Sequence, residues 1–456
     1  MMTIQSERIQ NLNVRPVRGS GDVLYWMEQS QRAEDNHALE YAVTLANEFH
    51  RSLHVVFGLM EDDQDATLRQ YRFMLEGLQE THAMLARRGI LMTIRFGHPV
   101  DVALEAGRTA SVIVCDRGYL RHQEVWRRKV AEEAACKVVQ IESDVVVPVE
   151  VASRKAETAA RTFREKLQRH LAKYLVDLPP QTLHRPSTSS SPRGLQLDDL
   201  EAVLHELKLD RAVPSVEKFH QGGTSQAKSR FREFIAHRLE GYERARNQPQ
   251  DPHVSYMSMY LHFGQISPLY LALQVQRAPI VLRGDVASFL DELMVHRELS
   301  INFCRFTSNY DQYECIPRWA NNTLEIHKKD RRQHLYSVKQ LEAAETHDPY
   351  WNAACRHMLV SGYMHNHMRM YWGKKIVEWS RTPEEAHAAT LHIMNRQYLD
   401  GRDPNSYSNT AWLFGLHDRP WGERPIFGKV RYMAASGLER KFDVDLYVKQ
   451  VRELAA

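Results

Sequence analysis

Three tryptophans in the second half of the chain have a spacing that suits the passage of electrons through packed rings. Trp372 and Trp379 are seven residues apart, so on a helix they share a face and lie about 10.5 Å apart along its axis. Trp351 opens the same region. Aromatic side chains at this spacing usually belong to a hydrophobic core. Closely packed indoles also relay electrons when a redox centre is nearby, and the spacing leaves both interpretations open.

Metal chemistry is not indicated by this region, although it is rich in histidine. His365 and His367 are two positions apart, and on a helix such side chains diverge by about 200°, so they do not face one ion. The five cysteines of the chain are widely spaced and include no CxxC pair. This usage argues against a cysteine-based zinc site and a disulfide scaffold, and it favours a reducing compartment.

Small hydroxyls and turn-forming residues mark two further candidate sites. Ser255 and Ser258 precede a helical run, where hydroxyls and free amide groups either bind phosphate oxygens or simply cap the helix. The stretch 400–412 is dense in Asp, Asn, Gly, Pro and Ser and predicts a loop. Asp400 at its start either caps a helix or holds an arginine that contacts a ligand.

A carboxylate and a histidine share one face of another predicted helix. Glu292 and His296 lie one turn apart, and Arg297 points to a different face. The pattern fits an ordinary amphipathic helix with charged neighbours. If the carboxylate is deep in the protein, however, it requires a hydrogen-bonding partner or a function.

The elements that position these residues fall into two classes along the chain. Residues 1–150 alternate short apolar runs with helical patterns, which predicts an α/β domain with a parallel sheet. The predicted strands are 23–27, 53–59, 90–96, 111–115 and 138–141, and the helices between them are 36–49, 66–88, 100–107 and 122–136. A dinucleotide fingerprint is missing, because Gly19 and Gly21 precede the first strand instead of following it.

The rest of the chain is predicted to be a connecting region and an all-helical domain. Residues 151–195 contain a basic helix, which reads most simply as a solvated face, and an exposed linker rich in Ser and Pro. From 196 to 456 helical periodicity dominates. The predicted helices are 198–207, 225–246, 268–276, 286–307, 348–379, 382–398 and 426–436.

Composition narrows the possible partners. The 456 residues carry 60 Lys and Arg against 57 Asp and Glu, a net charge of +3. This excludes a polybasic coat over nucleic acid but allows a local basic patch. No apolar run approaches a membrane span and the N-terminus lacks a signal pattern, so we expect a cytoplasmic protein. Six of the eight tryptophans follow residue 318, and two of these, Trp319 and Trp421, are expected in the core.

Ordered groups of residues along nearly the whole chain resemble one family, the class II cyclobutane pyrimidine dimer photolyases. The groups are Tyr25-Trp26-Met27 with Gln31-Arg32 and Asp35-Asn36, then VVPV at 146–149 leading to AART at 159–162, YLHFGQIS at 260–267, MRMYWGKK at 368–375, LDGRDPN at 399–405 and HDRPWGER at 417–424. Members of this family have an N-terminal α/β domain and a C-terminal helical domain that binds FAD. Both agree with the organisation predicted above.

The resemblance implies a role for each candidate residue around the flavin. Contacts to its phosphates and ribitol fall on Tyr242, Ser255, Ser258, Gln265 and Arg297. Asn395 would face flavin N5, and Arg369 and Asp400 would pair beside the isoalloxazine. Trp351, Trp372 and Trp379 resemble the chain that photoreduces FAD. The family's N-terminal domain also accommodates a second, antenna pigment, a deazaflavin or a folate, and the sequence does not decide whether one binds.

The same resemblance implies light-driven repair of a pyrimidine dimer flipped out of ultraviolet-damaged DNA. Fully reduced, excited FAD would give an electron to the dimer. Glu292 would hydrogen-bond the pyrimidine edge, and Met370 and Trp412 would pack on the dimer. Arg419 and Arg431 resemble the arginines that fill or flank the opened duplex. His296 also falls in the DNA-binding pocket, where the family has an aromatic residue such as Trp.

Alternatives to repair follow from the same residues. A cryptochrome-like light receptor would use the flavin and tryptophans without repair, but such receptors commonly carry a long polar C-terminal tail, and this chain stops at Ala456. A stand-alone nucleotide-binding α/β domain with an unrelated helical partner would bind no flavin. We expect a monomeric repair enzyme. The segment 395–400 is one residue shorter than the family pattern.

Overall fold

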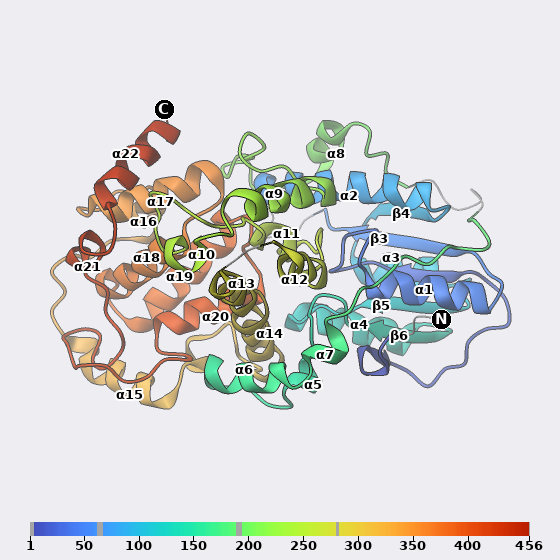
Figure 1. Ribbon diagram of the computed structural model, residues 1–456, viewed down its shortest axis with the longest axis horizontal. Coiled ribbons are helices and arrows are strands. Elements are labelled where there is room, and N and C mark those ends of the chain that lie inside the picture. Colours follow the sequence, from blue (N-terminus) through green and yellow to red (C-terminus); the bar gives the residue numbers. More distant parts are fainter. Residues whose placement is uncertain (1–3, 62–66, 188–193, 280–281, 456) are drawn as a thin grey trace.

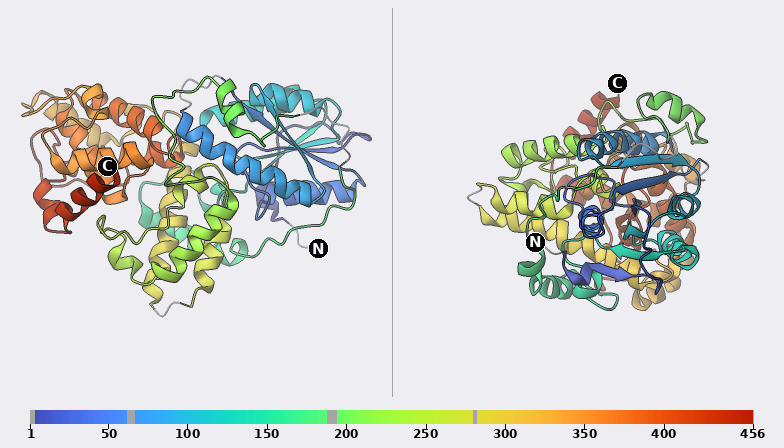
Figure 2. Two further views of the ribbon diagram at one scale, coloured as in Figure 1. Left: turned by 90° about the horizontal axis from the view of Figure 1, so that it is seen from above. Right: turned by 90° about the vertical axis from the view of Figure 1, so that its right-hand side faces the viewer.

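A six-stranded sheet lies at one end of the molecule and a bundle of helices at the other (Figures 1 and 2). The computed structural model describes residues 4–61, 67–187, 194–279 and 282–455. The strand order is β1-β6-β5-β2-β3-β4. The strands are β1 (Ile9–Asn11), β2 (Val23–Trp26), β3 (Leu53–Leu59), β4 (Leu91–Phe96), β5 (Val112–Asp116) and β6 (Lys137–Ile141).

The five predicted strands are confirmed, and all of them pair in parallel. The edge strand β1, antiparallel to β6, was not predicted. Its three residues are half-buried or exposed, so they show no apolar run. The parallel strands read as continuous apolar runs because helices bury both faces of the sheet.

Two pairs of helices cover the two faces. Helices α1 (His37–Glu48) and α2 (Leu68–Arg87) share a core with the side chains of Val23, Tyr25 and Val55. Helices α3 (Pro99–Gly107) and α4 (Arg121–Glu133) share the opposite core with those of Leu24 and Trp26. Neighbouring residues of β2 therefore enter different cores, as the alternation of a strand requires.

The connecting region first packs against the helical part and then returns to the α/β part. After α5 (Val149–Ala152), α6 (Ala160–Gln168) and α7 (Leu171–Tyr174), Ser187 donates its backbone N–H to the carbonyl of Gly89. Part of the predicted linker, 188–193, lies outside the described residues. Helix α8 (Leu200–Glu206) packs on α2, so it lies with the sheet although we expected it in the helical domain.

The helical part begins near residue 224 and contains the remaining elements. They are α9 (Thr224–His237), α10 (Tyr242–Ala245), α11 (Ser258–His262), α12 (Pro268–Arg277), α13 (Arg283–Leu290), a π-helical turn (Asp291–His296), α14 (Arg297–Phe306), α15 (Arg318–Ile326), α16 (Val338–Glu342), α17 (Pro349–Ser361), α18 (Asn366–Trp379), α19 (Pro383–Gln397), α20 (Pro404–Leu413), α21 (Ala435–Glu439) and α22 (Val444–Ala455). Within the described ranges, no helix is long and apolar enough to cross a membrane.

Four sequence predictions in this part were wrong in detail. The helices predicted at 225–246 and 348–379 are each interrupted by a left-handed glycine, Gly241 (φ 82°) and Gly362 (φ 71°). The stretch predicted as the loop 400–412 contains α20, because Asp403 caps the amide of Asn405 and Pro404 occupies the first helical position. Residues 426–434 form no helix, and α22 was not predicted.

Candidate functional site

One cavity of about 360 Å³ in the helical part gathers most of the candidate residues. It lies where α10, α11, the π-helical turn, α18 and α20 converge. Ten of the residues singled out from the sequence line it: Tyr242, Ser255, Ser258, Glu292, His296, Arg297, Arg369, Met370, Asp400 and Trp412. They come from segments up to 170 positions apart, so the tertiary fold assembles this cavity.

The π-helical turn supplies an acid and a base on one side of the cavity. The carboxylate of Glu292 accepts a hydrogen bond from the guanidinium of Arg246, and His296 Nε2 lies 4.0 Å from Glu292 Oε1. A hydrogen bond with Asp291 raises the pKa of His296 above its usual value. A π turn inserted in a helix is frequent at functional sites. This wall therefore brings acidic and basic side chains together.

The opposite wall contains an ion pair between α18 and the segment before α20. Arg369 Nη2 lies 3.3 Å from Asp400 Oδ1, and the guanidinium lies 4.1 Å from the ring centroid of Tyr398. Burial alone would lower the pKa of Arg369, but Asp400 outweighs it and the pKa is raised. Among the described residues, Arg369 Nε has no hydrogen-bond partner. A permanent cation with a free donor thus belongs to the cavity wall.

Arg297 and Asp403 connect the cavity to the α/β part. Arg297 Nη1 donates to the carbonyl of Asp144 at 2.8 Å. Asp403 Oδ2 lies 3.3 Å from His262 Nδ1. Burial would raise the pKa of Asp403, but its hydrogen bond with His262 contributes to a net lowering. Asp403 is therefore an anion inside the protein.

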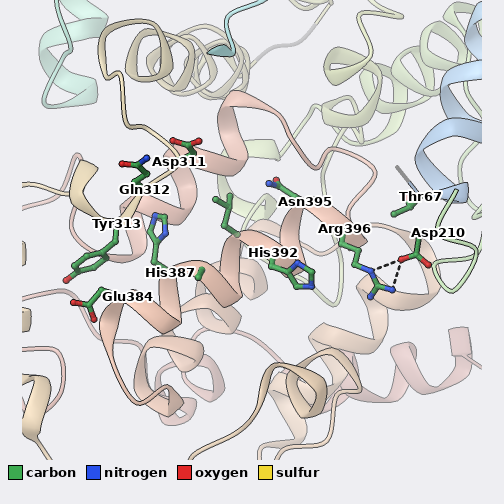
Figure 3. A pocket seen from close by; sticks show the side chains of 12 residues that line it. Thr67, Asp210, Asp311, Gln312, Tyr313, Glu384, His387, His392, Asn395 and Arg396 are labelled. Carbon is green, nitrogen blue, oxygen red and sulfur yellow. Dashed lines mark hydrogen bonds and ion pairs between the residues drawn. The ribbon is translucent and has the colours of Figure 1, made fainter. Parts of the chain in front are cut away.

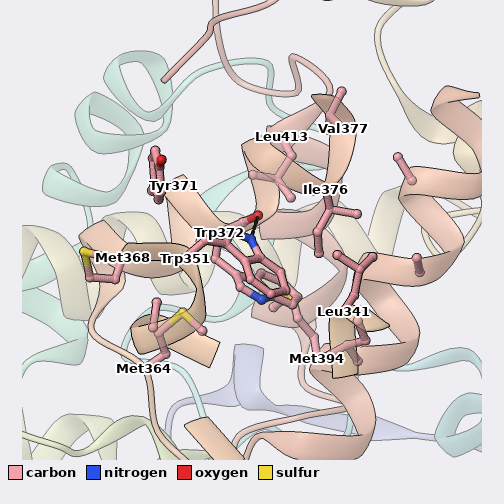
Figure 4. Close-up of a cluster of buried hydrophobic side chains, with 14 of the residues drawn as sticks. Leu341, Trp351, Met364, Met368, Tyr371, Trp372, Ile376, Val377, Met394 and Leu413 are labelled. Atoms are coloured by element: carbon pink, nitrogen blue, oxygen red, sulfur yellow. Dashed lines mark hydrogen bonds between the residues drawn. The ribbon is translucent and has the colours of Figure 1, made fainter. Parts of the chain in front are cut away.

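The three tryptophans form one chain of ring contacts that starts beside Arg369. Tyr398 lies 6.4 Å from Trp372, Trp372 stacks at 6.2 Å and 13° on Trp351, and Trp351 lies 5.6 Å from Trp379. Figure 4 shows Trp351 and Trp372 packed together among apolar side chains. The indole N–H of Trp351 donates to the carbonyl of Trp372 at 2.9 Å. The rings are thus part of the hydrophobic core, and they also form an unbroken row of ring contacts from Tyr398 to Trp379.

Two predicted residues do not reach this cavity. Gln265 is buried, and its carboxamide accepts from Gly223 N at 2.8 Å and donates to Phe73 O at 3.0 Å, so it joins α2 to the start of α9. Asn395 lines a different cavity of about 630 Å³ (Figure 3), and its Oδ1 accepts from the amide of Arg402. Both side chains are engaged in hydrogen bonds with backbone groups, and neither lines the helical cavity; their contact with the flavin stays a prediction.

Arg419 and Arg431 lie outside the cavity beside two tryptophans. The Arg431 guanidinium lies 5.8 Å from the Trp412 ring and 4.8 Å from the Trp421 ring, and Arg419 lies 5.2 Å from Trp421. Trp421 is 39% exposed, so its expected place in the core was wrong. Trp319 is partly buried against the helical core. Alternating cations and indoles therefore lead from Trp412 to the surface.

A further cavity of about 420 Å³, which we did not predict, lies at the carboxyl ends of β2 and β3. Met27, Phe57 and Trp126 line it, together with Glu28. Burial raises the pKa of Glu28 to about 8 although Arg127 Nη1 lies 3.5 Å from its carboxylate. The signal available in the sequence was position, because ligands bind at the carboxyl ends of parallel strands. Asp403 lines both this cavity and the helical one.

Three comparisons relate the chain to known proteins. A family model described as DNA photolyase matches residues 23–186. The chain is 47% identical over 453 residues to the deoxyribodipyrimidine photo-lyase of Methanothermobacter thermautotrophicus, covering 99% of both chains. It is 40% identical to that of Potorous tridactylus, over 94% of this chain and 81% of the relative.

Solved structures share the fold at low sequence identity. A class III photolyase from Agrobacterium tumefaciens has a TM-score of 0.73 at 19% identity, over 95% of this chain and 86% of the other. An archaeal photolyase from Sulfolobus tokodaii, solved with two FAD molecules, has a TM-score of 0.70 at 16% identity, over 94% and 89%. These matches extend over the sheet and the helical part together.

Proposed function

The chain belongs to the DNA photolyase family, and from this premise we propose that it repairs cyclobutane pyrimidine dimers in ultraviolet-damaged DNA by light-driven electron transfer from fully reduced FAD, as a class II enzyme. The observation that carries the proposal is the helical cavity. It gathers ten residues for which the family motifs imply flavin or lesion contacts. Identities of 37–47% to proteins named deoxyribodipyrimidine photo-lyase support the same conclusion.

The donor set of the cavity fits FAD. Arg369 has a free Nε donor and a fixed positive charge, which suits an electron-rich ring system or its anionic form. Ser255, Ser258 and Tyr242 supply hydroxyls along another side, where phosphate and ribitol oxygens need partners. Asp400 fixes the orientation of the Arg369 guanidinium. When bound, FAD supplies the light absorption and the transferable electron.

Residues at the mouth of the cavity fit a flipped-out pyrimidine dimer. The Glu292 carboxylate can accept hydrogen bonds from pyrimidine N–H groups, and Arg246 fixes its orientation. Met370 and Trp412 provide apolar surface for the dimer rings. His296 takes the place of the expected aromatic residue and offers a charged partner to DNA, since Asp291 favours its protonated form. The protein's share of the reaction is then orientation and electrostatics.

Arg431 and Arg419 are suited to the opened duplex next to the flipped dimer. They stand with Trp412 and Trp421 outside the cavity, where cations and exposed rings can contact phosphates and unpaired bases. Dimer extrusion is less costly than extrusion of a normal pair because the dimer stacks and pairs poorly. Binding of this kind does not depend on a particular base sequence.

The cavity at the carboxyl ends of β2 and β3, here called the sheet-edge cavity, is suited to a second pigment. Its lining is largely apolar and aromatic, with Trp126 and Phe57 available for stacking on a planar ring. It shares Asp403 with the helical cavity, so a pigment there would lie close enough to pass excitation to FAD. The Sulfolobus tokodaii structure contains two FAD molecules, which imply a novel light-harvesting cofactor in that protein. Deazaflavin and folate both remain candidates for this chain.

Repair of irradiated oligothymidylate tests the proposed function. The reduced protein, illuminated with blue light, should restore the ultraviolet absorbance that thymine loses on dimerisation, and a dark control should not. A protein that contains flavin but restores no absorbance would be a cryptochrome-like receptor. If the purified protein had no flavin colour, both the repair hypothesis and the receptor hypothesis would be rejected.

A further inference from the structure

Lys374 is a fully buried lysine beside the helical cavity, which is the proposed lesion pocket. It follows Trp372 and Gly373 on α18, and its exposed fraction is 0%. Its Nζ donates to the carbonyl of Leu413, the last residue of α20, at 2.6 Å. Nζ also lies 4.9 Å from the centroid of the Trp412 ring, which lines the pocket. Lys374 therefore supports Trp412 from inside the protein.

The ammonium group has no carboxylate within ion-pair distance among the described residues. Its favourable contacts are the carbonyl end of α20, where a cation complements the helix dipole, and the face of an indole. The charged groups that act on it belong to the segment after α20: Asp418 favours the charged form and Arg431 opposes it. The adjacent Lys375 differs, because it pairs with Glu378 at 2.7 Å.

Burial is the largest influence on Lys374. Together with the repulsion from Arg431 it outweighs Asp418 and lowers the pKa of Lys374 to about 7. For Lys375 the pairing with Glu378 overcomes burial and the pKa is raised. Two neighbouring lysines on one helix therefore have pKa values shifted in opposite directions, and Lys374 is the one that lies against Trp412.

We propose that Lys374 is a positioning residue for lesion binding, and that its buried amino group, when in the neutral amine form, takes up a proton from solvent and becomes an ammonium as lesion-containing DNA docks against Trp412. The inference rests on the proposed function, because it needs DNA at this face. Lys374 has no exposed surface to lose, so docking adds little desolvation. The phosphates that reach Arg431 add negative charge nearby, which favours protonation.

The proton uptake gives lesion affinity a definite pH dependence. DNA binds the protonated form more tightly, so affinity is high below the pKa of free Lys374 and falls as the pH rises through the pKa of the complex. A change of one unit in this pKa on binding corresponds to about a tenfold change in affinity between the two limits. We expect a loss of roughly three- to tenfold between pH 6.5 and 8.5.

Another titratable group faces the same pocket. The pKa of His296 is raised by its hydrogen bond with Asp291, so it is a second candidate for a pH-dependent contact with DNA. His417 lines the pocket too, but burial lowers its pKa to about 4, which leaves it neutral in this range. The test must therefore separate Lys374 from His296.

The experiment is calorimetric titration of the holoprotein with a duplex that carries one thymine dimer and with the undamaged duplex of the same sequence. Buffers of different ionisation enthalpy, at constant ionic strength, report the protons taken up. The variants are Lys374→Met, Lys374→Gln, His296→Gln and Lys375→Met. The two substitutions of Lys374 differ in polarity, and circular dichroism with flavin content checks that each is folded.

The inference predicts proton uptake and a pH-dependent affinity in the native protein, in His296→Gln and in Lys375→Met. Both Lys374 variants should lose the component of uptake seen with dimer duplex. Equal uptake in the native protein and a folded Lys374 variant would overturn the inference, even if repair is normal. If the native protein does not distinguish the two duplexes at any pH, the proposed function itself fails.

Discussion

The helical cavity and the sheet-edge cavity, which share Asp403 in their walls, differ in how many charged side chains line them. The helical cavity is lined by Arg246, Arg297 and Arg369 with several carboxylates, whereas the sheet-edge cavity is mainly apolar around the buried acid Glu28. Burial raises the pKa of Glu28 to about 8, so this acid is largely neutral at pH 7. The wall of the sheet-edge cavity is mainly apolar, and its carboxyl and guanidinium groups are those of Glu28, Arg402 and Asp403. We therefore expect the phosphate-bearing cofactor and DNA in the helical cavity, where fixed charges are more numerous, and a stacked pigment in the other.

The cavities also differ in how their walls are held. The charged groups of the helical cavity are fixed by ion pairs between distant segments, such as Arg369 with Asp400 and Arg246 with Glu292. The sheet-edge cavity is formed by the ends of β2 and β3 together with side chains of α2, α4, α11 and the start of α20. Substitutions in the helical cavity should therefore act by breaking ion pairs. Substitution of Glu28 in the sheet-edge cavity should mainly change how stability depends on pH.

Arg369→Leu should have the largest effect, because it leaves the Asp400 carboxylate without its counter-ion. Removing one partner of a buried pair costs about 3–5 kcal/mol. We expect a lower free energy of unfolding and a purified protein with little bound flavin, measured by denaturant titration and by the absorbance ratio of flavin to protein. Arg369→Lys keeps the charge and should be milder. Full flavin content in Arg369→Leu would contradict the assigned role.

Trp372→Phe should slow photoreduction of oxidised FAD by at least an order of magnitude, because phenylalanine is far harder to oxidise than the indole that stacks on Trp351. Repair by enzyme reduced beforehand should be unchanged. Time-resolved absorbance under blue light measures the first quantity and the oligothymidylate assay the second. Trp319→Phe, outside the ring chain, is the matched control. Equal photoreduction in both variants would refute the path.

Glu292→Ala should lower repair yield by roughly tenfold while flavin stays bound, since a hydrogen bond to a charged group is worth about 1.5–3 kcal/mol. The change also leaves Arg246 without its partner on the cavity wall. Repair per absorbed photon and flavin content are the two measurements. Glu243→Ala removes an exposed carboxylate from the nearby helix α10 and should have no effect.

Glu28→Gln should have the smallest effect on flavin content and repair, and it sharpens the contrast between the cavities. Because burial raises the pKa of Glu28, the folded protein binds more protons than the unfolded chain between about pH 4.5 and 8. The native protein should therefore lose stability as the pH rises through this range, by roughly 1.4 kcal/mol per pH unit at most. The variant should lack this loss and keep its flavin and repair. If the stability of the native protein and of Glu28→Gln depended on pH in the same way, the raised pKa of Glu28 would be contradicted.

The α/β part was predictable because its signals are local. Each parallel strand is an apolar run bounded by turn residues, and the predicted ranges agree with β2 to β6 within about two residues. Errors occurred where one local pattern fits two structures. Asp403-Pro404 reads as a turn, but it caps α20, and Trp421 reads as core although it is 39% exposed.

Sequence alone determined the order of the parallel strands, the family and ten residues of the helical cavity, because the motifs carry residue types together with their spacing. The tertiary structure decided which side chains meet. It removed Gln265 and Asn395 from the cavity, since both are engaged by backbone groups elsewhere. It also gave Glu292 its partner Arg246, and it buried Lys374 against Trp412 while Lys375 reached Glu378. Burial and pairing depend on neighbours distant in the chain, and no local pattern encodes them.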